Sequence, residues 1–170
     1  MRKQKGFSLI ELLIVVAIIL IIAAIAIPNL LRAKIAANES SAAASVRTLI
    51  TANVEYSTSY PNNGYAANLG ALGPGASTTC ATTGPTSTNA CIVDAVLAGG
   101  TKSGYSIADT GLNAVNGANT EFVISATPTT VNSSGVKGFC ATEDGVARWI
   151  TPATTGYTTV AACSALTPLQ

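Results

Sequence analysis

The residues best suited to chemistry in this 170-residue chain are four cysteines, Cys80, Cys91, Cys140 and Cys163. None of them forms a Cys-x-x-Cys pair, so an even count without metal-ligand spacing favours two disulfides in an oxidising compartment. The chain has no histidine, which excludes Ser-His and Cys-His nucleophilic sites and imidazole metal ligands. A hydrolase is therefore disfavoured, although acid-only chemistry is left open. We expect a protein that is not an enzyme, with no catalytic, cofactor-binding or metal-binding residues.

The disulfide connectivity is open on the sequence alone, because four cysteines allow three pairings. We expect Cys80–Cys91 and Cys140–Cys163, since each of these bonds closes a short loop. Free reactive thiols are the alternative to disulfides at these four positions.

The charged residues indicate no further site. The formal net charge is only +1, and beyond residue 60 the basic residues are Lys102, Lys137 and Arg148, so we expect no direct nucleic-acid binding. Glu143 and Asp144 are adjacent acids, but calcium needs six to eight oxygen ligands. A solvated hairpin turn is the simpler interpretation of that pair.

One more carboxylate, Glu11, lies inside a long apolar segment. Residues 1–6 carry three positive charges, and from Phe7 to Ile27 every residue except Ser8 and Glu11 is apolar. A helix over these residues is about 31 Å long, the thickness of a bilayer core. The basic flank predicts a cytoplasmic N-terminus, with everything after Pro28 outside. Placing a carboxylate within a membrane-spanning helix costs about 2.5–3.5 kcal/mol, so we expect Glu11 to have a specific role.

Residues 29–60 continue the helix with a different pattern. Apolar residues recur on a stripe at 31, 35, 42, 46, 50 and 54, which predicts an amphipathic half of the same helix. No glycine or proline interrupts it before the stop at 61–64. A helix over 7–60 would be about 80 Å long. A domain this small cannot bury such a helix, so its N-terminal half must contact lipid or other subunits.

The remaining residues, 61–170, predict a small globular head stapled by the disulfides. Strand patterns occur at 104–109, 121–127, 137–143 and 146–150, and Asp144-Gly145 predicts a two-residue hairpin between the last two. Residues 61–103 have few strand cues and predict a long loop. The expected fold is α+β: a long N-terminal helical spine, transmembrane and then amphipathic, packed on a small antiparallel sheet.

The segment KGFSLIELLIVVAII at 5–19, followed by Ala-Ile-Pro at 26–28, resembles the N-terminal signature of type IV pilins and type II secretion pseudopilins. The resemblance implies a pilin-like fold and a leader, 1–6, that prepilin peptidase removes after Gly6. It implies N-methylation of Phe7 and retention of the apolar helix, 7–28. It also implies that Glu11 pairs with the N-terminal amine of a neighbouring subunit, and that the helix kinks or melts near Pro28.

The function that this resemblance implies is that of a structural subunit of a type IV pilus, for adhesion, motility or DNA uptake. The precursor would sit in the bacterial inner membrane, and the assembly machinery would build it into an extracellular homopolymer. A type II secretion pseudopilin forming a periplasmic pseudopilus is the alternative, and a minor pilin at a filament tip is another. An ordinary signal peptide, with Ala24-Ile25-Ala26 as the cleavage site, would leave a secreted binding domain. A single-span anchor would leave Glu11 unexplained.

Overall fold

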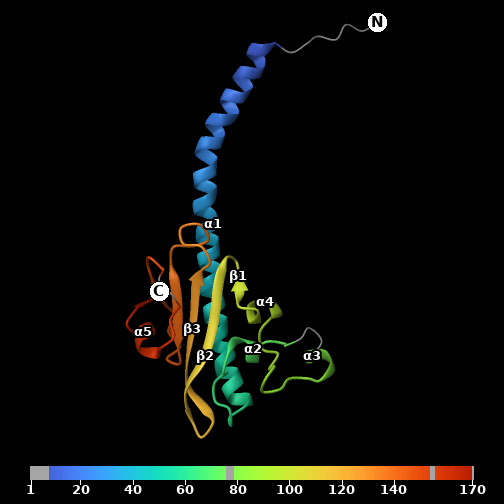
Figure 1. The fold of residues 1–170 in the computed structure, drawn as a ribbon, viewed down its shortest axis with the longest axis vertical. Helices are drawn as coiled ribbons and strands as arrows, with labels where there is room; N and C mark the ends of the chain where they lie inside the picture. The colour runs from blue at the N-terminus through green and yellow to red at the C-terminus, as the bar shows by residue number, and fades with distance from the viewer. Residues whose placement is uncertain (1–7, 76–78, 154–155, 170) are drawn as a thin grey trace. The chain divides into compact units, whose positions relative to one another are not determined.

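The computed structural model describes residues 8–75, 79–153 and 156–169, and the leader at 1–6 lies outside them. The helices are α1 Leu9–Ser59, α2 Leu69–Leu72, α3 Thr79–Thr82, α4 Ala95–Ala98 and α5 Val160–Ser164 (Figure 1). The strands are β1 Thr101–Lys102, β2 Tyr105–Val115, β3 Ala118–Pro128, β4 Gly138–Thr142, β5 Arg148–Ile150 and β6 Thr167–Pro168. The expected α+β class is confirmed.

The chain divides into two units, with the boundary between Lys34 and Ile35, inside α1. In the first unit α1 is helical through Pro28. Proline at a helix interior removes one backbone donor and crowds the carbonyl four residues earlier, yet this helix continues past it. The helix is long and apolar enough to cross a membrane, by length and composition.

In the second unit, the C-terminal half of α1 provides one wall of the head. Its buried residues are Ala42, Ala43, Ser45, Val46, Leu49, Ala52, Asn53 and Tyr56. The stripe expected from the sequence is therefore partly wrong, because Val54 is 51% exposed. A stripe followed in steps of four advances 400° per step and drifts around the helix, whereas the buried positions alternate steps of three and four.

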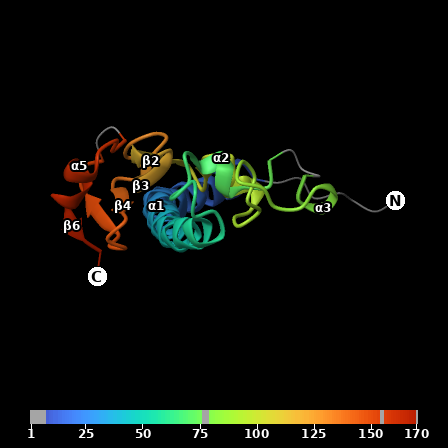
Figure 2. The same cartoon turned by 90° about the horizontal axis from the view of Figure 1, so that it is seen from below.

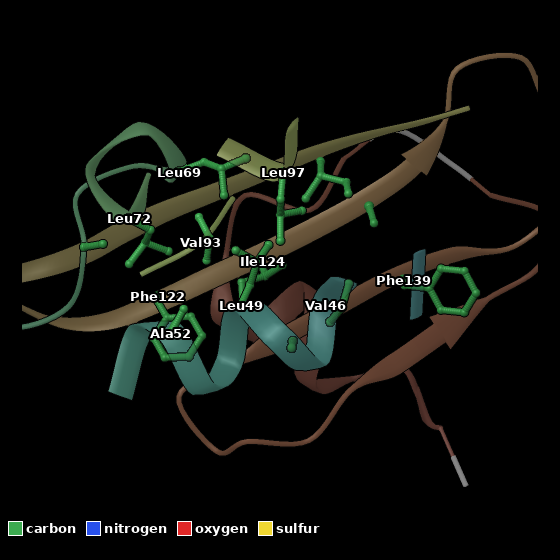
Figure 3. Close-up of a cluster of buried hydrophobic side chains, with 14 of the residues drawn as sticks. Val46, Leu49, Ala52, Leu69, Leu72, Val93, Leu97, Phe122, Ile124 and Phe139 are labelled. Carbon is green, nitrogen blue, oxygen red and sulfur yellow. The ribbon is translucent and has the colours of Figure 1, made fainter. Parts of the chain in front are cut away.

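The sheet has six strands in the order β1-β2-β3-β4-β5-β6, and every neighbouring pair is antiparallel. Its inner face packs against α1 around Val46, Leu49, Phe122, Ile124 and Phe139 (Figure 3). Apolar residues of α2 and α4 complete this core, which explains why short helices form where the sequence predicted a loop. Asn68 and Asp94 cap α2 and α4.

Both faces of the sheet are covered at β4, where all five residues are buried. Successive side chains on a strand point to opposite faces, so Phe139 meets the core beside α1 while Cys140 points the other way. Cys140 is bonded to Cys163 of α5. The C-terminal segment therefore covers the outer face of the sheet, and Figure 2 shows α5 and α1 on different sides of β3 and β4.

The longest hairpin, β2–β3, extends beyond the strands expected at 104–109 and 121–127. Its turn is Asn116-Gly117, where both residues have positive φ, 52° and 86°. These angles match the two-residue turns that suit twisted strands, for which Asn-Gly is preferred. Gly111 lets β2 continue, because a Cβ there would lie 2.6 Å from the carbonyl oxygen of Ala66.

The turn between β4 and β5 is longer than the two-residue hairpin expected at Asp144-Gly145. β4 ends at Thr142 and β5 begins at Arg148, so five residues connect them. The Asp144 carboxylate accepts hydrogen bonds from the Thr142 hydroxyl and the Val146 N–H, both at 2.9 Å. These side-chain bonds replace the ladder bonds that a tight hairpin would make.

Candidate assembly site

The first helical turn of α1 holds the carboxylate that the sequence singled out. The backbone N–H of Ser8 donates to Glu11 Oε2 at 2.9 Å, and the Leu12 N–H donates to the Ser8 carbonyl at 3.3 Å. This is one half of a capping box, in which an acid at the third helical position satisfies the donor of the capping residue. The sequence analysis missed this contact, although Ser8-x-x-Glu11 carries its signature.

The processing residues expected at Gly6 and Phe7 lie outside the described residues. Pro28 lies within α1, 17 positions after Glu11. The four cysteines are in the head. The expected site residues therefore lie far apart in the sequence, from the first turn of α1 to the disulfides of the head.

The dominant surface feature is the N-terminal part of α1, which is apolar all round. All the large apolar side chains from Leu9 to Leu31 are at least 44% exposed. An apolar surface of this extent, with no polar side to the helix, is stable only in lipid or against other apolar chains. Glu11 is the sole acidic side chain in this stretch of sequence, so it stands out chemically within that surface.

The head is tied to α1 by a polar clamp that the sequence did not reveal. Glu39 Oε1 accepts from the backbone N–H groups of Val136 and Lys137, at 2.9 and 3.1 Å. Its other oxygen lies 3.9 Å from the Lys137 ammonium, which sits 4.9 Å from the centre of the Trp149 ring. Asn38 also donates to the Ser134 carbonyl, at 2.8 Å. These bonds join the helix to the segment that leads into β4.

A second clamp is fully buried. Asn53 donates to Asp109 Oδ2 of β2 at 2.8 Å, and its own Oδ1 accepts from the Ala66 N–H at 3.2 Å. Among the described residues, Asp109 Oδ1 has no hydrogen-bond partner. Burial raises the pKa of Asp109 to about 7, against the opposing effect of the bond from Asn53. The neutral carboxyl group is therefore favoured below about pH 7.

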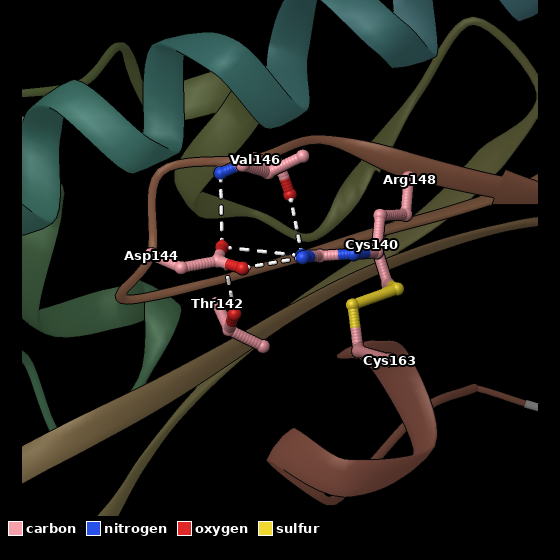
Figure 4. Close-up of polar contacts among 6 residues, drawn as sticks. All are labelled: Cys140, Thr142, Asp144, Val146, Arg148 and Cys163. Carbon is pink, nitrogen blue, oxygen red and sulfur yellow. Dashed lines mark hydrogen bonds and ion pairs between the residues drawn. A yellow bond between two sulfur atoms is a disulfide. The ribbon is translucent and has the colours of Figure 1, made fainter. Parts of the chain in front are cut away.

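The β4–β5 turn holds an ion pair between Asp144 and Arg148, and here the charged form of the acid is the stabilised one, unlike at Asp109. Asp144 contacts the Arg148 guanidinium through both carboxylate oxygens, at 3.1 and 2.5 Å (Figure 4). The hydrogen bond from Arg148 lowers the pKa of Asp144 to about 2. The acid is thus a structural part of the turn, and among the described residues no cluster of His, Cys, Asp and Glu could hold a metal ion.

The structure joins Cys80 to Cys91 and Cys140 to Cys163, the two short-loop pairings. The first bond closes the loop that carries α3, and the second fastens α5 to β4. No cysteine is free. The cysteines thus stabilise the head and leave no reactive thiol for chemistry among the described residues.

Comparison with known proteins supports the N-terminal signature. Residues 1–27 match the family model of the prokaryotic N-terminal methylation motif. The chain is 47% identical over 72 residues to the type IV wide pilus major component PilA4 of Thermus thermophilus, which covers 42% of this chain and 53% of the relative. It is 46% identical over 54 residues to the type IV major pilin protein PilA of Myxococcus xanthus, covering 32% of this chain and 24% of the relative.

The alignment thus spans about half of one relative and a quarter of the other. No solved structure matches the chain at a significant level. Both relatives are named as pilus proteins, which bears out the resemblance found in the sequence and the prediction of a structural protein rather than an enzyme.

Proposed function

Since the chain is a relative of the type IV pilins that carries the N-terminal methylation motif, we propose that it is a filament subunit of a type IV pilus, assembled through α1. The observation that carries the proposal is the apolar surface of α1, whose large side chains are all at least 44% exposed between Leu9 and Leu31. Lipid can cover this surface in the precursor. In a filament, the same surface of neighbouring subunits covers it.

The proposed maturation begins with prepilin peptidase, which removes the leader 1–6 by cutting after Gly6 and then methylates the amine of Phe7. The precursor is held in the inner membrane by 7–28, with its N-terminus in the cytoplasm and its head outside. In the filament, the Phe7 amine of one subunit pairs with Glu11 of another. Two opposite charges in an apolar bundle have one favourable arrangement, so this pair sets the axial register. Local melting of α1 near Pro28 is part of the same proposal.

The globular head, 61–170, supplies the outer surface of the filament. Removal of the leader takes away three of the nine basic residues, so the mature side chains carry a net charge of −2. A weakly charged exterior rich in hydroxyl groups suits a long extracellular fibre. Both disulfides are expected to persist in that oxidising environment.

The mass and N-terminal sequence of the mature protein test the maturation. We expect a chain that begins at Phe7 and carries one added methyl group on its amine. A chain that begins at Ile27 would contradict the proposal, because a signal peptidase would have removed the apolar helix. Deletion of the gene separates a pilus from a pseudopilus: loss of surface filaments supports the proposal, and loss of protein secretion with filaments intact contradicts it.

Substitution of Glu11 tests the register role. We expect Glu11→Ala and Glu11→Gln each to leave a stable membrane protein and to lower filament yield at least about tenfold, because neither side chain can pair with an amine. Glutamine can still accept the hydrogen bond from the Ser8 N–H, so it keeps the capping contact. Normal filament yield from Glu11→Gln would show that capping, not charge, is what Glu11 contributes. Glu143→Gln, an exposed acid of the head, is the matched control.

A further inference from the structure

The face of α1 that points away from the head has an unusual composition between residues 44 and 59. Its exposed residues are spaced by one, three and four, as on one side of a helix: Ala44, Arg47, Thr48, Thr51, Val54, Glu55, Thr58 and Ser59. A helix face that stays in water normally carries many charges. This face has small or uncharged residues and one exposed valine, apart from one base and one acid.

The two charged residues have opposite signs and lie too far apart to meet within one chain. Arg47 precedes Glu55 by eight residues, which corresponds to about 12 Å along the helix axis. Eight residues are a little over two turns, so both side chains lie on the same face. Within the described residues, neither one makes an ion pair.

The exposed face is flanked by a hollow on each side. One, of about 410 Å³, lies between Arg47, Thr51 and the segment 145–147. The other, of about 260 Å³, lies between Thr51, Glu55 and Ile92. A helix ridge with a groove on either side is the shape into which the ridges of a second helix pack.

We propose that this face binds a second copy of the chain, with Arg47 of one subunit paired to Glu55 of the next. The inference rests on the proposed filament function and names the contact made by the amphipathic half of α1. Two parallel copies of α1 bring these residues together when one is displaced by about 12 Å along the axis. Such a displaced contact is heterologous and does not close, so its repetition builds a filament rather than a dimer.

A second copy fits this face better than an unrelated partner, because the face carries both members of the pair. A rotation about the filament axis combined with the axial displacement turns Arg47 of one copy toward Glu55 of the next. Each subunit uses Arg47 toward one neighbour and Glu55 toward the opposite neighbour. Both charges are then neutralised inside the fibre, and only the subunits at the two ends keep an unpaired charge. In both this contact and the Phe7–Glu11 contact, the positive group precedes the negative one, so both displace the neighbour in the same direction.

Charge reversal tests the contact in cells that assemble the wild-type filament. We expect Arg47→Glu and Glu55→Arg each to lower the yield of sheared filaments about tenfold, because each places like charges together. The double variant R47E/E55R restores the pair with its signs exchanged, and we expect a yield within about twofold of wild type. A double variant that stays as low as the single variants would overturn the proposal, as would single variants with wild-type yield.

The matched control keeps the net charge of the double variant but puts the new base elsewhere. In R47E/E143R the arginine lies on the β4–β5 turn, and we expect no rescue. Equal rescue by this control would mean that overall charge matters and would overturn the specific pairing. Near-ultraviolet circular dichroism of each variant, compared with wild type, shows whether the head is folded.

A reconstruction of the wild-type filament gives an independent result that needs no variant. We expect the guanidinium of Arg47 within about 4 Å of the carboxylate of Glu55 in a neighbour, with an axial displacement of about 12 Å between those subunits. Filaments in which the two residues are far apart would overturn this inference while leaving the proposed function intact. Failure of the wild-type protein to form any filament would count against the proposed function instead.

Discussion

The buried carboxyl group of Asp109 makes the stability of the head depend on pH. Asp109 is 4% exposed, and its one side-chain partner is Asn53, itself fully buried. Within the part of the chain that the structure describes, no charged group contributes to the pKa of Asp109, which burial raises from 3.8 to about 7. The ionised form is therefore penalised in the folded state but not in the unfolded chain. Asp109→Asn replaces this acid with a neutral side chain of nearly the same shape.

The sign and size of the effect follow from linkage between protonation and folding. Because the folded pKa is above the unfolded one, the stabilisation is complete below pH 3.8 and is lost as the pH rises to about 7. The two pKa values differ by about three pH units, which corresponds to a loss of about 4 kcal/mol in the free energy of unfolding. That is a large share of the 5–15 kcal/mol typical of a domain.

Urea unfolding of the full chain in detergent micelles, between pH 4 and pH 8, measures this effect. Near-ultraviolet circular dichroism follows the aromatic residues, most of which belong to the head. We expect the wild-type free energy of unfolding to fall across this range, and Asp109→Asn to be nearly constant and more stable than wild type at pH 8. The same decline in both proteins would refute the assignment to Asp109.

Asp144→Asn is the matched control, since the same chemical change is made at an acid whose pKa is lowered to about 2 by Arg148. The stabilisation from Asp144 is present above its unfolded pKa, 3.8, and is lost as the pH falls toward 2. We therefore expect this variant to be less stable than wild type at pH 7, with the decline between pH 4 and pH 8 unchanged. The side chain is 38% exposed, so the loss is only about 1 kcal/mol.

Two further changes test what holds the head together. Asn53→Ala leaves a buried backbone N–H and the Asp109 carboxyl group without their partner. We expect the free energy of unfolding in urea to fall by about 3 kcal/mol. A fall of less than about 1 kcal/mol would contradict the role given to this clamp. Replacing Cys140 and Cys163 with serine opens a loop of sequence separation 23. We expect the free energy of unfolding to fall by about 3 kcal/mol, slightly more than on removal of the Cys80–Cys91 bond, whose sequence separation is 11. An unchanged urea midpoint would contradict this expectation.

The parts of the molecule that local patterns control could be predicted from the sequence. The apolar helix follows from composition, and the strands of the head follow from β-branched residues. The β2–β3 hairpin shows the limit of such reasoning, since its Asn116-Gly117 turn is a strong hairpin signal that the sequence analysis missed. The expected strand stopped at 109, but β2 continues through Gly111, which is required there because the Ala66 carbonyl and the Asn119 side chain approach it closely.

The two polar clamps could not be predicted, because their partners are far apart in the chain. Asn53 and Asp109 are separated by 56 residues, and Glu39 and Val136 by 97. Only the folded chain brings the partners of each clamp together. In the sequence, nothing distinguishes Glu39 or Asp109 from an ordinary exposed acid. Asn53 gave one signal that was overlooked, since an amide on the buried side of a helix needs a partner for each of its polar atoms.

The clamps also explain how a head domain can determine the contacts of a filament. Small residues on the buried side of α1, such as Ala42 and Ala52, let the sheet approach closely, but a smooth surface would leave the helix free to rotate about its axis. Glu39 and Asn53 prevent this rotation, because they bind fixed partners at two points 14 residues apart, about 21 Å along the helix. The rotation of the helix decides which residues stay exposed. The clamps therefore place Arg47 on the outer face, where a neighbouring subunit can reach it.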